Sequence, residues 1–133
     1  MSDFDSFVAN CIPPYAGTGS RRGPARLLGD YYAIITNVAD GYDDVVAEYY
    51  NDLSCRYFIQ EIIDDPRARE LPGYSSFVTS VTKLDDDFKA LLTSRPVAPG
   101  RYWWETHLPL EAGAKLREEC QALYGYSPRE VLE

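Results

Sequence analysis

His107 is the only histidine in the chain, and acidic residues stand on both sides of it. Its imidazole and the carboxylates of Glu105 and Glu111 are ligand types that suit iron, manganese or zinc. The spacing matches no common metal-binding motif, however, and Pro109 prevents one helix from presenting all three side chains. A histidine-based nucleophile system needs a serine or cysteine partner, and the sequence points to none. We therefore predict no metal and no cofactor, and the simplest interpretation of His107 is a loop residue.

Two tryptophans next to His107 keep a second interpretation open. Trp103, Trp104 and His107 lie within five residues of one another and could line a pocket between helices, where small molecules commonly bind. The alternative function is therefore a small enzyme or ligand-binding protein with its pocket at these residues, with or without a carboxylate-bound metal.

Acidic residues are concentrated in the middle of the chain. The protein has 21 acidic and 13 basic residues, a formal net charge of −8, and the segment 40–65 alone carries eight acidic residues against Arg56. A solvated helix face is the simpler interpretation of such a run. A docking surface is the functional one, because a negative field speeds association with a basic partner. The same charge argues against direct nucleic-acid binding.

A glycine-rich stretch near the N-terminus is a weak candidate for anion binding. Residues 17–23 combine three glycines with two arginines, directly before a helix predicted to begin near Pro24. The spacing matches neither a dinucleotide-binding loop nor a P-loop, so a flexible loop over 13–24 is the simpler interpretation. If an anion binds here, the residues to test are Arg21, Arg22 and Arg26.

The aromatic content is high, with 11 tyrosines and two tryptophans in 133 residues. Adjacent helical residues point roughly 100° apart, so one ring of a doublet such as Tyr31-Tyr32 should reach the surface. Tyrosine and tryptophan are also common at binding hot spots. The binding surface is therefore predicted to comprise Asp40, Asp43, Asp44, Glu48, Tyr49, Tyr50, Asp52, Trp103, Trp104 and His107.

The elements that must position these residues are predicted to be helices. Apolar periodicity indicates helices over about 3–11, 25–38, 43–64, 77–91 and 110–124, and a capping pattern indicates a last one over 128–133. The stretch 43–64 carries two apolar stripes, so it is either a central helix or breaks near Ser54. Prolines predict an extended aromatic segment near 96–109, with a weak strand signal at Arg101–Thr106.

Together these elements predict one all-α domain over residues 1–133, a compact bundle of about five or six helices. The cysteines, Cys11, Cys55 and Cys120, are too far apart in the sequence for a disulfide framework or a zinc site. They are predicted to be small buried residues of a cytoplasmic protein. No apolar run is long enough to span a membrane.

The function that these observations favour is a small, acidic, non-catalytic protein-binding module. It would dock on a basic partner protein in the manner of inhibitors, immunity proteins or anti-defence proteins, a comparison made at the level of class only. The sequence leaves the oligomeric state open, and a homodimer with a two-fold interface is compatible with it.

Overall fold

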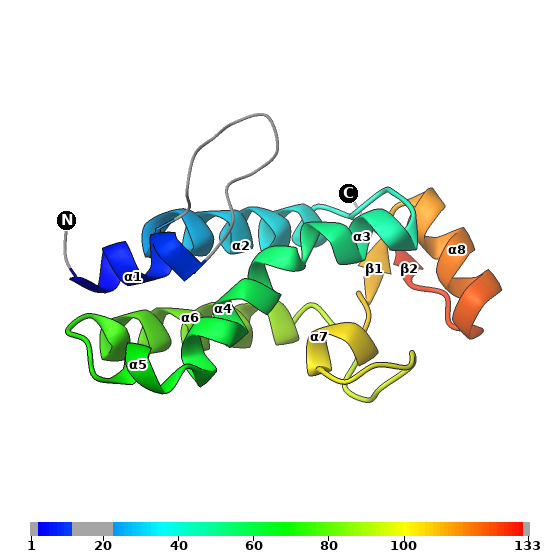
Figure 1. The fold of residues 1–133 in the computed structure, drawn as a ribbon. Helices are drawn as coiled ribbons and strands as arrows, with labels where there is room; N and C mark the ends of the chain where they lie inside the picture. Colours follow the sequence, from blue (N-terminus) through cyan, green and yellow to red (C-terminus); the bar gives the residue numbers. More distant parts are fainter. Residues whose placement is uncertain (1–2, 12–22, 132–133) are drawn as a thin grey trace. The chain divides into compact units, whose positions relative to one another are not determined.

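A computed structural model describes residues 3–11 and 23–131 of the chain (Figure 1). The chain divides into two compact units. Unit 1 comprises 1–32 and 54–84, and unit 2 comprises 33–53 and 85–133. The loop expected over 13–24 falls almost wholly outside the described residues. The single domain over 1–133 stays a prediction.

Unit 1 contains α1 (Asp3–Cys11), the first part of α2 (Pro24–Ala39), α4 (Ser54–Asp64), α5 (Pro66–Arg69) and most of α6 (Tyr74–Lys89). Helix α1 buries Phe4 and Val8, which are one turn apart on the same face. The Phe4 ring packs against Tyr74 and Phe77 at the start of α6, with ring centres 6.5 and 5.4 Å away. The Tyr74 hydroxyl donates a hydrogen bond to the Ile63 carbonyl at 2.7 Å, which ties α6 to the end of α4.

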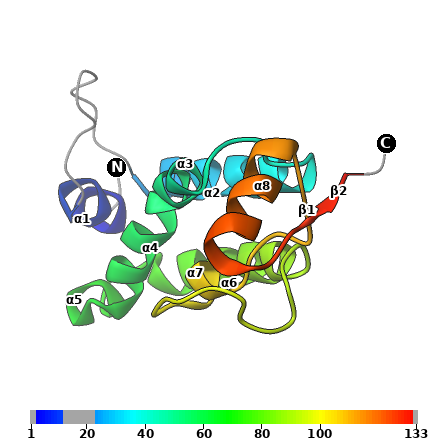
Figure 2. The ribbon, with the colours of Figure 1, turned by 90° about the vertical axis from the view of Figure 1, so that its right-hand side faces the viewer.

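Unit 2 contains the end of α2, α3 (Val46–Asp52), the end of α6, α7 (Trp103–Thr106), β1 (Glu111–Ala112), α8 (Ala114–Tyr124) and β2 (Arg129–Glu130). Helix α8 turns its buried residues Leu116 and Cys120 toward the core of the unit. Gly125 ends this helix in the left-handed conformation, at φ 69°, which glycine adopts readily. Strand β2 then runs parallel to β1 (Figure 2).

The all-α fold class is confirmed. Six helices of the described residues are longer than four residues, which agrees with the expected five or six. The stretch 43–64 breaks near Ser54, which is one of its two predicted forms, because α3 ends at Asp52 and α4 begins at Ser54. Leu53 at the break is buried. In the described part of the chain, no helix has the length and apolar character needed to cross a membrane.

The helix predicted over 128–133 is wrong, since Arg129–Glu130 form a strand instead. Long-range hydrogen bonds override the capping pattern there. The Arg129 backbone N–H donates to the Leu110 carbonyl at 2.8 Å, and the Tyr126 hydroxyl donates to the Pro109 carbonyl at 2.8 Å. These bonds hold the chain extended beside β1.

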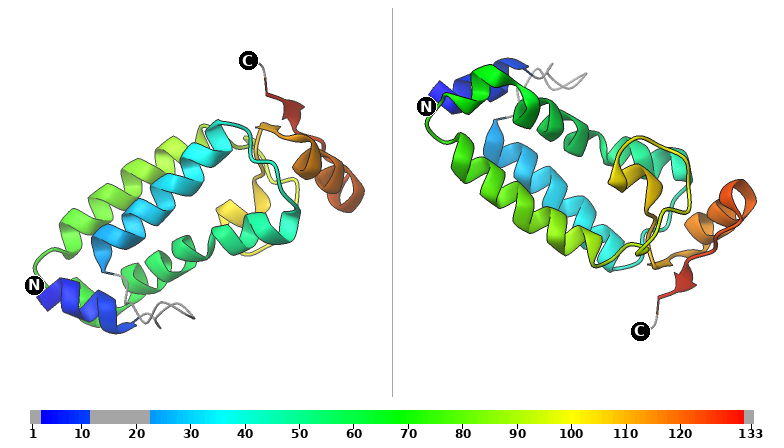
Figure 3. Two further views of the ribbon diagram at one scale, coloured as in Figure 1. Left: turned by 90° about the horizontal axis from the view of Figure 1, so that it is seen from above. Right: turned by 90° about the horizontal axis from the view of Figure 1, so that it is seen from below.

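Three smaller expectations also need correction. The weak strand signal at 101–106 is wrong, because Trp103–Thr106 form the one-turn helix α7, the short yellow helix of Figure 3. The Glu105 carboxylate caps this turn by accepting the backbone N–H groups of Arg101 and Tyr102, at 3.0 and 2.8 Å. The helical spacing of Leu116, Cys120 and Leu123 predicts that all three face inward, but Leu123 is 58% exposed. Cys11, expected to be buried, is exposed, whereas Cys55 and Cys120 are buried as predicted.

Candidate functional site

The acidic segment, defined as Asp40, Asp43, Asp44, Glu48 and Asp52, lies in unit 2 at the end of α2, in the following loop and on α3. Two of its carboxylates hold the local structure together. Asp43 accepts the Lys115 backbone N–H at 2.9 Å in the first turn of α8, whose own N-cap residue, Gly113, has no side chain to do so. Asp52 accepts the Tyr42 hydroxyl at 2.6 Å.

Helix ends account for two further members of the segment. Asp44 precedes α3 and accepts the Val45 backbone N–H at 2.7 Å, and Glu48 lies in the first turn of the helix. Negative groups are favoured there, because the N-terminus of a helix carries partial positive charge. Asp40 has the opposite position, since it directly follows the C-terminus of α2 and is exposed. The helix dipole therefore favours a negative charge at Asp44 and at Glu48. It disfavours a negative charge at Asp40.

Tyr49 does not belong to the surface on which the sequence placed it. Its side chain is 0% exposed and meets the rings of Tyr42 and Tyr50 edge to face, with centres 5.3 and 5.4 Å away. The buried Tyr49 hydroxyl has no hydrogen-bond partner among the described residues. Burial raises the pKa of all three tyrosines above the usual value. Tyr49 is therefore a core residue in this structure.

The other tyrosines follow the predicted division of each doublet between core and surface. Tyr31 is buried, whereas its neighbour Tyr32 is 62% exposed. Tyr50 is half-buried and donates its hydroxyl to the Glu105 carbonyl at 2.8 Å. Of the two tyrosines in the predicted binding set, only Tyr50 therefore keeps part of its ring accessible.

The tryptophans divide in the same way. Trp104 is 1% exposed, and its ring stacks on Tyr102 with centres 4.4 Å apart. Trp103 and His107 line a cavity of about 220 Å³ in unit 2, together with Lys89, whose Nζ lies 4.8 Å from the Trp103 ring centre. Of the three residues predicted to line a pocket, Trp103 and His107 line this cavity and Trp104 does not, whereas Lys89 lines it without having been predicted.

The orientation of the His107 ring follows from its neighbour. Nδ1 lies 2.8 Å from the Thr93 carbonyl oxygen. A carbonyl can only accept, so Nδ1 carries a proton and Nε2 is the nitrogen left for a ligand. With Glu105 occupied in capping α7, the two carboxylates and His107 do not converge. Within 3–11 and 23–131, no three side chains drawn from histidine, cysteine, aspartate and glutamate are grouped so that they could hold a metal ion.

The candidate anion site can be followed only in part. Arg21 and Arg22 lie outside the described residues. Arg26, on α2, pairs with Asp30 one turn later, with Nε 3.2 Å from the carboxylate oxygen. That carboxylate would compete with an incoming anion for Arg26.

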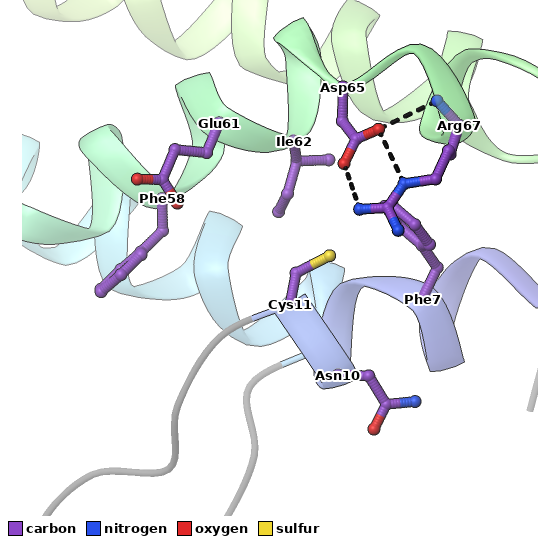
Figure 4. A pocket seen from close by; sticks show the side chains of 8 residues that line it. All are labelled: Phe7, Asn10, Cys11, Phe58, Glu61, Ile62, Asp65 and Arg67. Carbon is purple, nitrogen blue, oxygen red and sulfur yellow. Dashed lines mark hydrogen bonds and ion pairs between the residues drawn. The ribbon is translucent and has the colours of Figure 1, made fainter.

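A second cavity, of about 400 Å³, lies in unit 1, and the sequence reasoning did not identify it. Side chains of α1, α4 and the α4–α5 junction line it (Figure 4). Phe7 and Cys11 come from α1, Phe58 and Glu61 from α4, and Asp65 from the junction. Two features of the sequence lie at this cavity, the second apolar stripe on 43–64 and the Asp-Pro pair after it. Neither indicated that α1 would supply the other lining residues.

The Asp65 carboxylate in this cavity is held by a single neighbour. It accepts the Arg67 backbone N–H at 2.9 Å, and it pairs with the guanidinium through Nε at 3.2 Å and Nη2 at 2.8 Å. These hydrogen bonds lower the pKa of Asp65. The Arg67 guanidinium also lies over the Phe7 ring, 5.2 Å from its centre. Although Cys11 is exposed as a residue, partial burial of its thiol raises the pKa of that group, and Asp65 adds to this rise.

The chain was compared with protein-family models, with characterised proteins and with solved structures. No significant match was found in any of the three.

Proposed function

We propose that this chain is a small, non-catalytic protein-binding module that docks on a basic partner protein through its acidic segment. The observation that carries the proposal is Asp40. It adds negative charge at a helix C-terminus, where the helix dipole disfavours it, and it is exposed. An acidic residue that costs stability and faces solvent is well placed for a role outside the fold.

The surroundings of Asp40 strengthen the field that a partner would meet. No lysine or arginine occurs between residues 40 and 55, whereas five acidic residues do. Asp40, Asp44 and Glu48 form no ion pair with the described residues. Like charges in one region add their potentials, and this speeds the approach of a basic protein and makes its binding sensitive to salt.

The proposal includes a class of activity and a compartment. Inhibitors, immunity proteins and anti-defence proteins act by occupying a surface of another protein, and such a role needs no cofactor. The three cysteines are free, which is compatible with the reducing conditions of the cytoplasm. We place the protein there.

The experiment is affinity capture from a lysate of the source cells, at low and at moderate salt, followed by mass spectrometry. We expect one stoichiometric basic protein at low salt and its loss at moderate salt. Asp86→Lys provides a matched control for Asp40→Lys, since both residues are exposed and both changes add the same charge. Capture that survives Asp40→Lys, or that Asp86→Lys abolishes equally, contradicts the proposal.

The Trp103–His107 cavity favours a second candidate function, the binding of a small anion. Lys89 and His107 offer a cation and a ring nitrogen beside an indole face. At about 220 Å³ the cavity has room for only a small ligand. Benzoate is a suitable probe, and its binding should perturb tryptophan fluorescence in the wild type and weaken in Lys89→Met. Equal binding of benzylamine would argue against an anion site.

A further inference from the structure

We propose that the cavity of unit 1 binds a small organic ammonium ion carried on an apolar stem. This inference is independent of the protein-docking role and concerns a different part of the chain. It is based on the size of the cavity, its apolar lining and the arrangement of three charged side chains.

The size and lining of the cavity suit a small organic ligand. Its volume of about 400 Å³ falls within the range of roughly 300–1,000 Å³ that is usual for small-molecule sites. Phe7, Phe58 and Ile62 supply aromatic and aliphatic surface, and Ile62 is almost fully buried. In Figure 4, Ile62 lies between two groups of lining residues, Glu61 and Phe58 on one side and the Asp65–Arg67 pair on the other. An apolar stem would displace water from this lining.

The charged residues of the cavity set the sign of the ligand. Asp65 and Arg67 neutralise each other through two side-chain contacts, at 2.8 and 3.2 Å. Glu61 forms no ion pair with the described residues. The lining therefore carries one negative charge in excess. A cation entering beside the apolar lining is attracted by Glu61, whereas a carboxylate is repelled by it.

Arg67 is a cation of the protein itself that already lies on an aromatic face of this cavity. Its guanidinium lies 5.2 Å from the centre of the Phe7 ring, within the range in which aromatic faces attract positive charge. Phe58 brings a second ring to the same cavity, on the side where Glu61 lies. A ligand ammonium there would find a carboxylate and an aromatic ring together.

Cys11 lines the cavity together with its three charged residues. The pKa of its thiol is raised by burial first, and the carboxylates of Asp65 and Glu61 both raise it further, while Arg67 acts in the opposite direction. With its pKa raised, the thiol stays neutral near pH 7 and does not act as a ready nucleophile.

Cys11 makes the proposal testable in the native protein, because it is the exposed cysteine while Cys55 and Cys120 are buried. We would measure its reaction with two methanethiosulfonates of matched size, one carrying ethylammonium and one ethylsulfonate. Each rate is divided by the rate for a small free thiol, which removes the intrinsic preference of thiolates for cationic reagents. Loss of labelling in Cys11→Ser confirms the site of reaction.

We expect the cationic reagent to be favoured in the wild type and the preference to fall about fivefold in Glu61→Gln, the effect of one unit charge at close range in water. Glu70→Gln is the matched control, since Glu70 is exposed in the same unit and does not line the cavity. An unchanged preference in Glu61→Gln, or an equal fall in Glu70→Gln, overturns the assigned charge.

Ligand binding is tested with three probes that share a phenyl stem: 2-phenylethylamine, 2-phenylethanol and 3-phenylpropionate. The neutral reagent N-ethylmaleimide reports whether a probe protects Cys11. We expect protection by the amine at concentrations about tenfold lower than by the alcohol, as for one charge-assisted contact, and none by the acid. Equal protection by acid and amine, or no protection by the amine, overturns the proposal.

Discussion

The chain has two acidic regions, and they use their carboxylates differently. In the acidic segment of unit 2, Asp43 and Asp52 accept hydrogen bonds from the fold itself, and Asp44 and Glu48 sit at a favourable helix end. In the cavity of unit 1, Glu61 is an exposed lining residue that forms no ion pair with the described residues. The comparison shows that acidic residues close together in the sequence can have very different surroundings in the fold.

The largest expected effect concerns a carboxylate of the first region that acts within the fold. Asp43→Ala removes the acceptor for the Lys115 N–H at the start of α8 and should lower the free energy of unfolding by about 1–2 kcal/mol, as for the loss of a helix cap. Urea denaturation measures the change. Asp86→Ala, at an exposed position inside α6, should stay within about 0.5 kcal/mol of the wild type. Equal stability of the two variants would show that Asp43 does not cap α8.

Two neighbouring tyrosines under the acidic segment should respond in opposite directions to the same change. Tyr42→Phe removes the hydrogen bond to Asp52 and should destabilise the protein by about 1 kcal/mol. Tyr49→Phe removes a buried hydroxyl that has no hydrogen-bond partner among the described residues and should stabilise it by about 1 kcal/mol. Thermal unfolding of the pair checks both signs. A loss of stability in both variants would show that the Tyr49 hydroxyl has a partner in solution.

The same tyrosines predict sensitivity to alkali. The pKa values of Tyr42, Tyr49 and Tyr50 are raised in the folded state, chiefly by burial. Tyrosines of the unfolded chain ionise near pH 10, so the unfolded state loses protons first. Stability is therefore fully present below about pH 10 and falls as the pH rises above it. Urea titrations from pH 8 to 11 should show this fall, and a smaller one in Tyr42→Phe. A flat profile would contradict the burial of these hydroxyls.

The smallest expected effect on stability distinguishes an acidic residue at a helix C-terminus, Asp40, from one at a helix N-terminus, Glu48. Asp40→Asn relieves an unfavourable charge at the end of α2 and should raise stability by about 0.3–1 kcal/mol. Glu48→Gln removes a favourable charge at the start of α3 and should lower it by a similar amount. Both differences should shrink in high salt. Denaturation of the two variants side by side tests the assignment, and changes of the same sign would contradict it.

The sequence predicted the elements of the fold better than the partners of its side chains. Phe77, Val81 and Phe88 repeat at helical spacing, and they are buried along α6 as that spacing indicates. Residues 127–130 fit a helix start equally well, but their hydrogen bonds with residues far away in the sequence make them part of a strand pair. Local patterns therefore fail where a distant segment supplies the competing bonds.

The candidate sites show the same limit. The pocket at Trp103 and His107 was predicted from neighbours in sequence, whereas Lys89 joins it from the end of another helix. The unit 1 cavity combines α1 with α4, which are more than 40 residues apart. Tyr49 was expected on the surface because composition alone does not distinguish a buried tyrosine from an exposed one.

The most direct test of the central claim compares two charge-reversed variants that carry the same net charge. Asp40→Lys with Glu48→Lys alters the acidic segment, and Asp86→Lys with Glu70→Lys alters exposed acidic residues elsewhere. The captured partner is purified, and its affinity for each folded variant is measured by titration calorimetry at low salt. We predict a loss of at least about tenfold for the first variant and a change within about twofold for the second. Equal losses in both would mean that net charge alone governs binding, and would contradict docking through the acidic segment.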